Sequence, residues 1–293
     1  MPTLASLAKQ EEHTVASPSN QAAASSLTIS LLTGKHQSEV LTFLSERPLH
    51  TVAMVSMIQD NGLLSPLNRG TFYACRNEAG QLEGVALIGH ATLLETRTDA
   101  ALQVFAELAR KSQHKHLIMG EQEKIERFWS YYAGVGQDAR HLCRELLFEQ
   151  RWPVQAHEVV RGLRQATLED LELVMPVQAQ MAFEESGINP MEADPTGFRL
   201  RCARRIEQGR LIFKADIIAE SPQVSYLEGV YTNPEERGKN YGLRCVSQLS
   251  RILLARTSSV CLLVNEKNRE AQEFYLRAGY KLRSYYDTIF LQQ

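Results

Sequence analysis

The sequence predicts an α/β protein built from two similar halves, and three observations lead to this fold class. The 293 residues suffice for two domains with cores of their own, because a domain takes roughly 150 residues. Strand-like and helix-like periods alternate along the chain, and the alternation begins again after residue 152. Hydrophobic residues make up 44% and charged residues 23%, so a disordered or fibrous chain is excluded.

The first half is expected over residues 27–152, after a mobile tail over residues 1–26 that shows no sustained apolar period. Its helices are predicted by apolar residues at helical spacing and its strands by short apolar runs. The predicted elements are a helix within 39–59, strands at 71–75 and 84–88, a helix at 98–111, a strand at 116–119, an aromatic helix at 124–132 and a strand near 144–148.

The second half is expected over residues 153–293. Thr167 is a predicted helix cap, because Glu169 and Asp170 place acid in the turn that follows it. The predicted elements are a strand at 158–163, the helix after Thr167, a helix at 195–208, strands at 211–218 and 224–232, a helix at 241–256, a strand at 260–264, a helix at 269–278 and a strand near 285–291.

Two short features repeat at a common spacing of 145 residues. The tetrapeptide Leu-Glu-Gly-Val occurs at 82–85 and again at 227–230, and an Ala-Gly pair closes an aromatic helix at 133–134 and again at 278–279. Because both repeats share one offset and one strand-to-helix context, they indicate an internal duplication.

Charge and cysteine usage limit the partners. The net charge of −2 gives no field that attracts nucleic acid or an anionic membrane. The sequence has no apolar run near the roughly 18 residues of a spanning helix and no basic N-terminal region before an apolar core, so we expect a cytoplasmic location. Five widely spaced cysteines predict reduced thiols, and neither disulfides nor a metal site is expected. The oligomeric state is left open.

One loop in the second half has anion-binding character. The strand that ends Val230-Tyr231-Thr232 is followed by Asn233-Pro234, then by Arg237-Gly238-Lys239-Asn240-Tyr241-Gly242, which opens into a helix. Backbone N–H groups at a helix start lack partners within the helix and carry positive potential, so they can hold a diphosphate. Gly238 and Gly242 permit a close approach, and Arg237 and Lys239 add charge.

This loop and the segment after it resemble the GNAT acyltransferases. The family's phosphate loop reads Arg/Gln-x-x-Gly-x-Gly/Ala, and Arg237 and Gly242 fit its ends while Asn240 replaces its first glycine. The family's second signature is a strand, then Asn-x-x-Ala-x-x-x-Tyr and a Gly-aromatic pair. Residues 261–264 with Asn268, Ala271, Tyr275, Gly279 and Tyr280 match it.

The resemblance implies a fold and a cofactor. Each half would be a mixed, mostly antiparallel twisted sheet flanked by helices, and in the second half the parallel strands 224–232 and 260–264 would splay apart. Acetyl-CoA would be the co-substrate, with its pantetheine arm along Val230, Tyr231 and Thr232 and its diphosphate on the amides of residues 237–242. Asn268 would hold the loop or contact the cofactor. The resemblance thus implies an acetyl-CoA-dependent N-acetyltransferase whose acceptor is a small-molecule or peptide amine.

Two residues are candidates for proton transfer. An amine with a pKa near 10.4 is mostly protonated at neutral pH, so a base is needed, and no histidine follows His157 in the chain. Glu228 is the favoured base because it shares the strand parity of Tyr226 and Val230 if no bulge intervenes; Glu184, Glu185 and Asp216 are alternatives. Tyr275 occupies the place of the family's thiolate-protonating tyrosine.

The first half lacks these features. At the duplication offset the loop falls on residues 92–97, which contain no glycine, and Tyr275 corresponds to Ser130. The first half is therefore expected to be a degenerate copy of the second. Acidic residues near the expected cleft, Glu184, Glu185 and Glu192, suit a cationic acceptor. The alternative function is a non-catalytic CoA-binding or protein-interaction scaffold, and the size of the acyl group stays open.

Overall fold

The computed structural model describes residues 27–112, 115–164, 167–203 and 213–292, so the predicted tail at 1–26 lies outside the described residues. The strands are β1 (Thr28–Leu31), β2 (Gly70–Arg76), β3 (Leu82–Gly89), β4 (Ala91–Thr96), β5 (Leu117–Glu121), β6 (Ala139–Gln150), β7 (Phe213–Glu220), β8 (Val224–Thr232), β9 (Ser259–Asn265) and β10 (Lys281–Leu291). The α-helices are α1 (Gln37–Ser45), α2 (Pro48–Asn61), α3 (Asp99–Lys111), α4 (Gln122–Tyr132), α5 (Leu171–Ser186), α6 (Pro190–Ala193), α7 (Pro195–Ala203), α8 (Tyr241–Leu253) and α9 (Arg269–Arg277).

The strands form one sheet in the order β1-β2-β3-β4-β5-β10-β6-β9-β8-β7. Seven of its neighbouring pairs are antiparallel, and the pairs β4–β5 and β8–β9 are parallel. The predicted fold class, a mixed and mostly antiparallel sheet flanked by helices with a parallel pair in the second half, is therefore confirmed.

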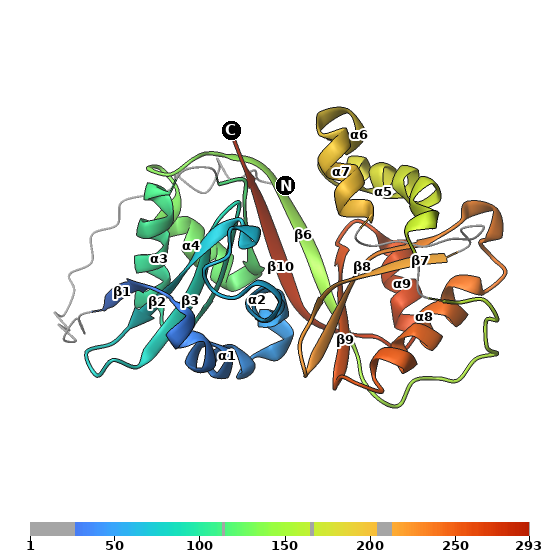
Figure 1. Cartoon of the computed structure of the whole chain (residues 1–293), viewed down its shortest axis with the longest axis horizontal. Helices are drawn as coiled ribbons and strands as arrows, with labels where there is room; N and C mark the ends of the chain where they lie inside the picture. The colour runs from blue at the N-terminus through green and yellow to red at the C-terminus, as the bar shows by residue number, and fades with distance from the viewer. Residues whose placement is uncertain (1–26, 113–114, 165–166, 204–212, 293) are drawn as a thin grey trace, which may run out of the picture.

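The two halves exchange their last strands. β6 pairs with β9 of the second half, and β10 lies between β6 and β5 of the first half. Figure 1 shows β6 and β10 side by side along the middle of the molecule, with α3 and α4 on one side of them and α8 and α9 on the other. Ten rungs join β6 to β10, so the sheet is continuous across the junction.

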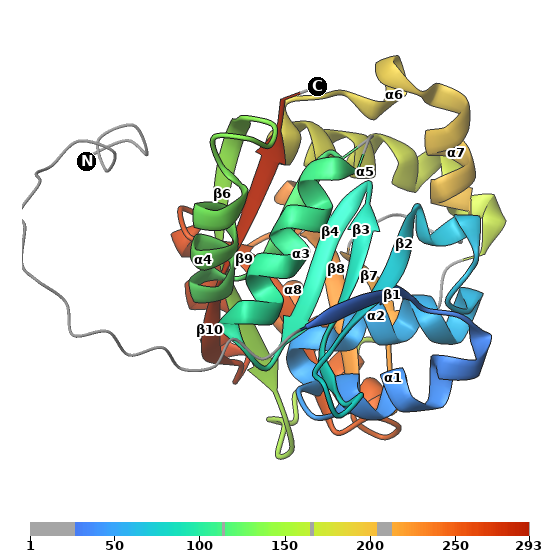
Figure 2. The ribbon, with the colours of Figure 1, turned by 90° about the vertical axis from the view of Figure 1, so that its left-hand side faces the viewer.

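Four helices, α3, α4, α8 and α9, cover one face of the sheet, and α1 and α2 cover the opposite face. In the first half, Phe105 of α3 and Phe128 of α4 pack into one apolar cluster. In the second half, Val246 of α8 and Tyr275 of α9 pack into another. Figure 2 looks from the side of the first half and shows α3 and α4 to the left of β2–β4, with α1 and α2 at the lower right.

Helix α2 also reaches across the junction. Val52 of α2 packs with Leu147, Val224, Cys261 and Tyr286, which belong to β6, β8, β9 and β10. The face of the second half opposite α8 and α9 is therefore covered by a helix from the first half, and this contact creates the cavity described below.

The strand predicted at 158–163 is wrong. This stretch has no strand pairing; instead, the backbone N–H of Val160 donates to Oε1 of Gln248, 2.8 Å away, and the carbonyl of Glu158 accepts from Arg244 at 3.1 Å. Side chains of α8 thus satisfy backbone groups that a sheet would otherwise have to satisfy.

The duplication holds for the element order from β3 and β7 onward but not for the tetrapeptide. In the parallel pairs, β4 lies beside β5 as β8 lies beside β9, whereas the first Leu-Glu-Gly-Val lies in β3. Residues 92–96, the expected loop equivalent, are part of strand β4, and only Arg97 and Thr98 connect it to α3. The Ala-Gly repeat is structurally equivalent, because Gly134 and Gly279 follow α4 and α9 with φ of 81° and 89°.

Candidate functional site

A gap opens between β8 and β9. Their parallel ladder runs from Val224 and Ser259 to Leu227 and Leu262, yet β8 continues to Thr232 and β9 to Asn265. Within the described residues, no strand pairs with the β9-facing edge of β8 beyond Leu227. That edge therefore offers backbone donors and acceptors to an extended ligand.

A bulge in β8 lies at the start of this gap. Two residues, Gly229 and Val230, face one residue of β7 between the rungs Lys214–Tyr231 and Asp216–Glu228, and Gly229 has φ of +58°. Because of the bulge, Val230 packs against the same cluster as α8 and α9. Glu228 keeps the alternation of Tyr226, which lies on the α2 face. The shared parity of Glu228 and Val230 is predicted for a strand without a bulge; with the bulge, the two side chains lie on opposite faces.

The loop after β8 leads to the start of α8, where the side chain of the N-cap residue makes no capping hydrogen bond. Asn240 is the N-cap residue of α8 in the left-handed conformation, with φ of +58°, and makes no capping hydrogen bond. In α3, the corresponding helix of the first half, Thr98 Oγ1 accepts from the N–H of Ala101 at 3.3 Å. The first amides of α8 thus remain for an anion, whereas in α3 a side chain takes this place.

Gly242 holds the helix start against the strand end. A Cβ at Gly242 would lie 2.7 Å from Oγ1 of Thr232 and 3.4 Å from the ring of Phe274. Gly238 has φ of +78° and open space around it. Glycine is therefore needed at position 242 for a close approach and at position 238 for the backbone angle.

The basic residues of the loop differ in how they are held. Arg237 is exposed, and its Nε donates to the carbonyl of Thr232 at 3.3 Å. Lys239 forms an ion pair with Glu236 at 2.9 Å. Asn268 accepts from the N–H of Ala271 at 3.0 Å and so caps α9. Arg237 can turn toward an anion at the loop, while Asn268 fixes the helix that carries Tyr275.

Tyr275 lies in the core between α9 and the sheet. Its side chain is 7% exposed, and its ring lies 5.5 Å from that of Tyr280 and 6.3 Å from that of Phe148. Burial, with a smaller effect from Tyr280, raises the pKa of the Tyr275 phenol. Because Val230 belongs to the same cluster, Tyr275 lies on the α8 side of the gap, and its phenol is protonated at neutral pH.

The carboxylates proposed as bases lie in different surroundings. Glu228 is exposed and close enough to Tyr226 to contribute, after burial, to the raised pKa of that phenol. Asp216 is buried and pairs with Lys214 at 2.7 Å, which also donates to the carbonyl of Gly229 at 3.1 Å. The side chains of Glu184 and Glu185 lie outside the described residues. Glu228 is thus the exposed carboxylate beside the gap, while Asp216 and Lys214 support the bulge.

The corresponding gap in the first half is filled by charged side chains. β4 and β5 pair only at two rungs, Ala91–Leu117 and Thr92–Ile118, and each strand carries a carboxylate beyond them. Arg47 bridges Glu95 at 3.2 Å and Glu121 at 2.6 Å. Lys124 contacts Glu95 and lies 3.9 Å from Glu121. Two cations thus hold together the strand ends that would have to part for a ligand.

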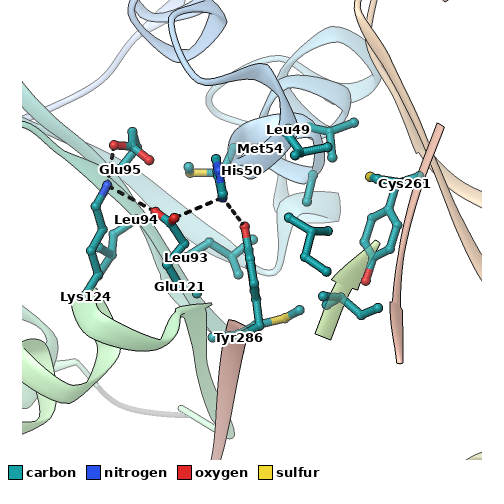
Figure 3. Close-up of a pocket in the computed structure, with 17 residues that line it drawn as sticks. Leu49, His50, Met54, Leu93, Leu94, Glu95, Glu121, Lys124, Cys261 and Tyr286 are labelled. Carbon is teal, nitrogen blue, oxygen red and sulfur yellow. Dashed lines mark hydrogen bonds and ion pairs between the residues drawn. The ribbon is translucent and has the colours of Figure 1, made fainter. Parts of the chain in front are cut away.

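A cavity of about 60 Å³ lies between α2 and the sheet. Its charged end holds Glu95, Glu121 and Lys124, and its other end holds Cys261 (Figure 3). Tyr226, the β8 partner of Cys261, also lines it. His50 Nδ1 lies 2.8 Å from the hydroxyl of Tyr286 and 3.4 Å from Glu121. Burial lowers the pKa of His50 in spite of the nearby Glu121, so the imidazole is neutral at pH 7.

Sequence reasoning did not find these cavity residues. They come from α2, α4 and six strands that lie far apart in the chain, and none of them belongs to a local motif. The one local signal is the pair of glutamates, Glu95 and Glu121, each at the end of an apolar strand in the first half.

Among the described residues, no group of three or more His, Cys, Asp or Glu side chains is arranged to hold a metal ion. The five cysteines are buried and unbridged, as the sequence predicted. In the described ranges, no helix combines the length and the apolar character needed to cross a membrane.

The comparisons with known proteins agree with this geometry. The profile of the FR47-like protein family matches residues 207–289, the part that contains the gap, the loop and Tyr275. No curated protein is significantly similar in sequence.

Solved structures share the fold over nearly the whole chain, each at low identity. A Drosophila protein matches with a TM-score of 0.64 at 12% identity, covering 90% of this chain and 98% of its own. A tandem GNAT protein from the clavulanic acid biosynthesis pathway matches at 0.55 and 12%, covering 92% and 99%. A GNAT-family acetyltransferase from Colwellia psychrerythraea matches at 0.52 and 11%, covering 90% and 100%. The resemblance predicted from the sequence is confirmed at the level of the fold: this chain shares its fold with GNAT proteins, including one of tandem arrangement.

Proposed function

We propose that this protein is an acetyl-CoA-dependent N-acetyltransferase with a single active site, in residues 153–293. The observation that carries the proposal is the gap between β8 and β9, which opens beside the uncapped start of α8. An unpaired strand edge and a set of free amides lie next to each other there. CoA needs the first for its pantetheine arm and the second for its diphosphate. The thioester of acetyl-CoA supplies an activated acyl group.

The residues of β8 and its loop divide the binding between them. The backbone of Val230, Tyr231 and Thr232 would pair with the pantetheine arm, because this edge of β8 has no ladder partner among the described strands. The amides of residues 238–242 would hold the diphosphate, with Arg237 adding charge. Gly242 makes this arrangement possible, since any Cβ there would push α8 away from Thr232.

The proton transfers fall to residues on opposite faces of the sheet. Glu228, exposed on the α2 face, would accept a proton from the acceptor ammonium, directly or through water, so that the amine nitrogen can attack the thioester carbon. Tyr275, on the α8 face, would donate a proton to the sulfur as the carbon–sulfur bond breaks. Burial raises the pKa of this phenol, so its proton is present at neutral pH when the thiolate leaves.

The first half lacks the open strand gap, the uncapped helix start and the long loop that form the proposed site in the second half. Its gap is closed by Arg47 and Lys124, its equivalent helix start is capped by Thr98, and its strand-to-helix connection contains only two residues. We therefore propose that residues 27–152 are a degenerate copy that supports the active half, chiefly through α2. The acceptor would be a small-molecule or peptide amine. Glu192, suggested as a contact for a cation, is exposed and accepts from Asn189 at 2.8 Å.

Calorimetric titration of acetyl-CoA tests the proposal. We expect one site per chain, and we expect Gly242→Asp to abolish binding because it adds both bulk and negative charge at the diphosphate site. Screening of amines by CoA release should then reveal turnover. Binding without turnover on any amine would favour the alternative, a CoA-binding scaffold. Absence of acetyl-CoA binding would refute both the enzyme and the scaffold. Two binding sites per chain would show that the first half is not degenerate.

A further inference from the structure

The cavity beneath α2 extends from one strand gap to the other. Every strand from β4 to β8 in the sheet order contributes to its lining: β4, β5, β10, β6, β9 and β8. Because neighbouring strands lie about 4.8 Å apart, these six strands span roughly 24 Å. The lining of the cavity is therefore drawn from across the sheet rather than from one pair of strands.

One end of the cavity lies at the proposed thioester position. Tyr226 and Cys261, which line it, form the rung next to the last rung of the β8–β9 ladder. Leu263, one residue beyond the last rung, lines it as well. An acyl group that passes through the gap from the α8 face to the α2 face thus enters this end of the cavity.

The lining has little to offer a charged or polar occupant. Most of it consists of apolar side chains: Leu49, Val52, Ala53, Met54, Leu93, Leu94, Met119, Leu147 and Leu263. The polar groups at the far end are already paired: Lys124 contacts Glu95 and Glu121, and His50 contacts Tyr286 (Figure 3). Arg47, which does not line the cavity, pairs with both glutamates as well. The occupant that this lining favours is a short hydrocarbon chain.

The size of the cavity limits the length of that chain. A volume of about 60 Å³ has room for roughly four groups the size of a water molecule or a methylene. The single methyl group of acetyl would leave most of this space unfilled.

We propose that the cavity is an acyl-chain pocket, and that the same site takes short-chain aliphatic acyl-CoA thioesters, up to about butyryl in length, as well as acetyl-CoA, and binds the longer ones more tightly. This inference rests on the proposed function, because it places the thioester in the gap between β8 and β9. It assigns to the first half a direct role in substrate choice, since α2 forms the roof of the pocket.

The test compares the binding of free CoA, acetyl-CoA and butyryl-CoA to the full chain by calorimetry, which requires no knowledge of the acceptor. We expect butyryl-CoA to bind about tenfold more tightly than acetyl-CoA, since two further methylenes are removed from water. Ala53→Leu fills the pocket from α2 and should abolish this difference, while the affinity for free CoA stays unchanged. Gln59→Leu adds the same side chain at an exposed position of α2 and serves as the matched control.

The outcomes separate the two proposals. Equal affinities for acetyl-CoA and butyryl-CoA in the wild type, or a preference that survives in Ala53→Leu, would overturn the acyl-chain pocket and leave the proposed function intact. If none of the three compounds binds, the proposed function fails and this inference fails with it. Unchanged binding of free CoA shows that the Ala53→Leu variant is folded. If this variant does not fold, Ala53→Val, which adds a smaller side chain, takes its place.

Discussion

Replacing Gly242 by alanine tests how α8 and β8 together form the diphosphate site. The added Cβ would lie 2.7 Å from Oγ1 of Thr232, whereas ordinary contact begins at 3.4 Å, so the helix start and the strand end must part by about 0.7 Å. The ring of Phe274, 3.4 Å away on the other side, limits the direction of the movement. The amides of the loop therefore shift relative to the edge of β8.

The expected magnitudes follow from this displacement. Overpacking costs about 1–3 kcal/mol, and alanine returns up to about 1 kcal/mol through its higher helix propensity, so the free energy of unfolding should fall by at most about 3 kcal/mol. The affinity for CoA should fall at least about tenfold, because hydrogen bonds to the diphosphate weaken when their donors move together. Urea unfolding gives the first quantity and calorimetry with CoA the second.

Two variants make this experiment specific. Gly34→Ala adds a methyl group where nothing lies within 4 Å, so it should change neither stability nor affinity appreciably. The double variant Thr232→Ala/Gly242→Ala removes the hydroxyl that the new Cβ meets and should recover most of the lost affinity. Wild-type affinity and stability in Gly242→Ala alone would refute the reasoning that this close approach sets the site.

Four further predictions concern single side chains. Tyr275→Phe should leave the affinity for CoA unchanged and lower kcat about tenfold to a thousandfold; a wild-type kcat across the pH range would rule out its acid role. Glu228→Gln should lower kcat/KM by a similar factor and remove the acidic limb of its pH profile, and a retained limb would point to another base. Lys124→Met should lower the free energy of unfolding in urea by about 1.5–3 kcal/mol, because Glu95 loses one of its two cations and keeps only Arg47, while CoA affinity stays the same. Burial, with a further contribution from Arg69 and His116, lowers the pKa of His90 to about 4, so as the pH falls the unfolded chain is protonated at this histidine before the folded chain is. The free energy of unfolding should therefore decrease as the pH falls from 6.5 to about 4. His90→Gln should flatten this part of the pH profile measured by urea unfolding.

Local sequence signals predicted the second half of the fold well. Helices α8 and α9 are strongly amphipathic, and Asn268 and Gly279 mark the ends of α9. The strand-loop-helix motif at 230–242 and the signature around Tyr275 therefore gave the candidate residues near the gap. These features depend on residues that are close to one another in the sequence, so the sequence pattern shows them directly.

The remaining features depend on distant contacts. Strand β1 has four residues, mostly exposed, so it gives little apolar alternation. The bulge at Gly229 is stabilised by Lys214 and cannot be seen in the β8 pattern alone, although it reverses the side on which Val230 lies. The cavity arises only when α2 packs across the exchanged strands, and pairing between residues far apart in the chain decides that arrangement.

The place of β10 in the sheet has a consequence for how the chain folds. β5 ends at Glu121, but its antiparallel neighbour β10 begins only at Lys281 and is therefore synthesised much later. Until then β5 presents an open edge, which can pair with other chains. Contacts of such wide sequence separation favour slow folding, so we expect refolding yields to decrease with protein concentration and to depend on an intact stretch at 281–291.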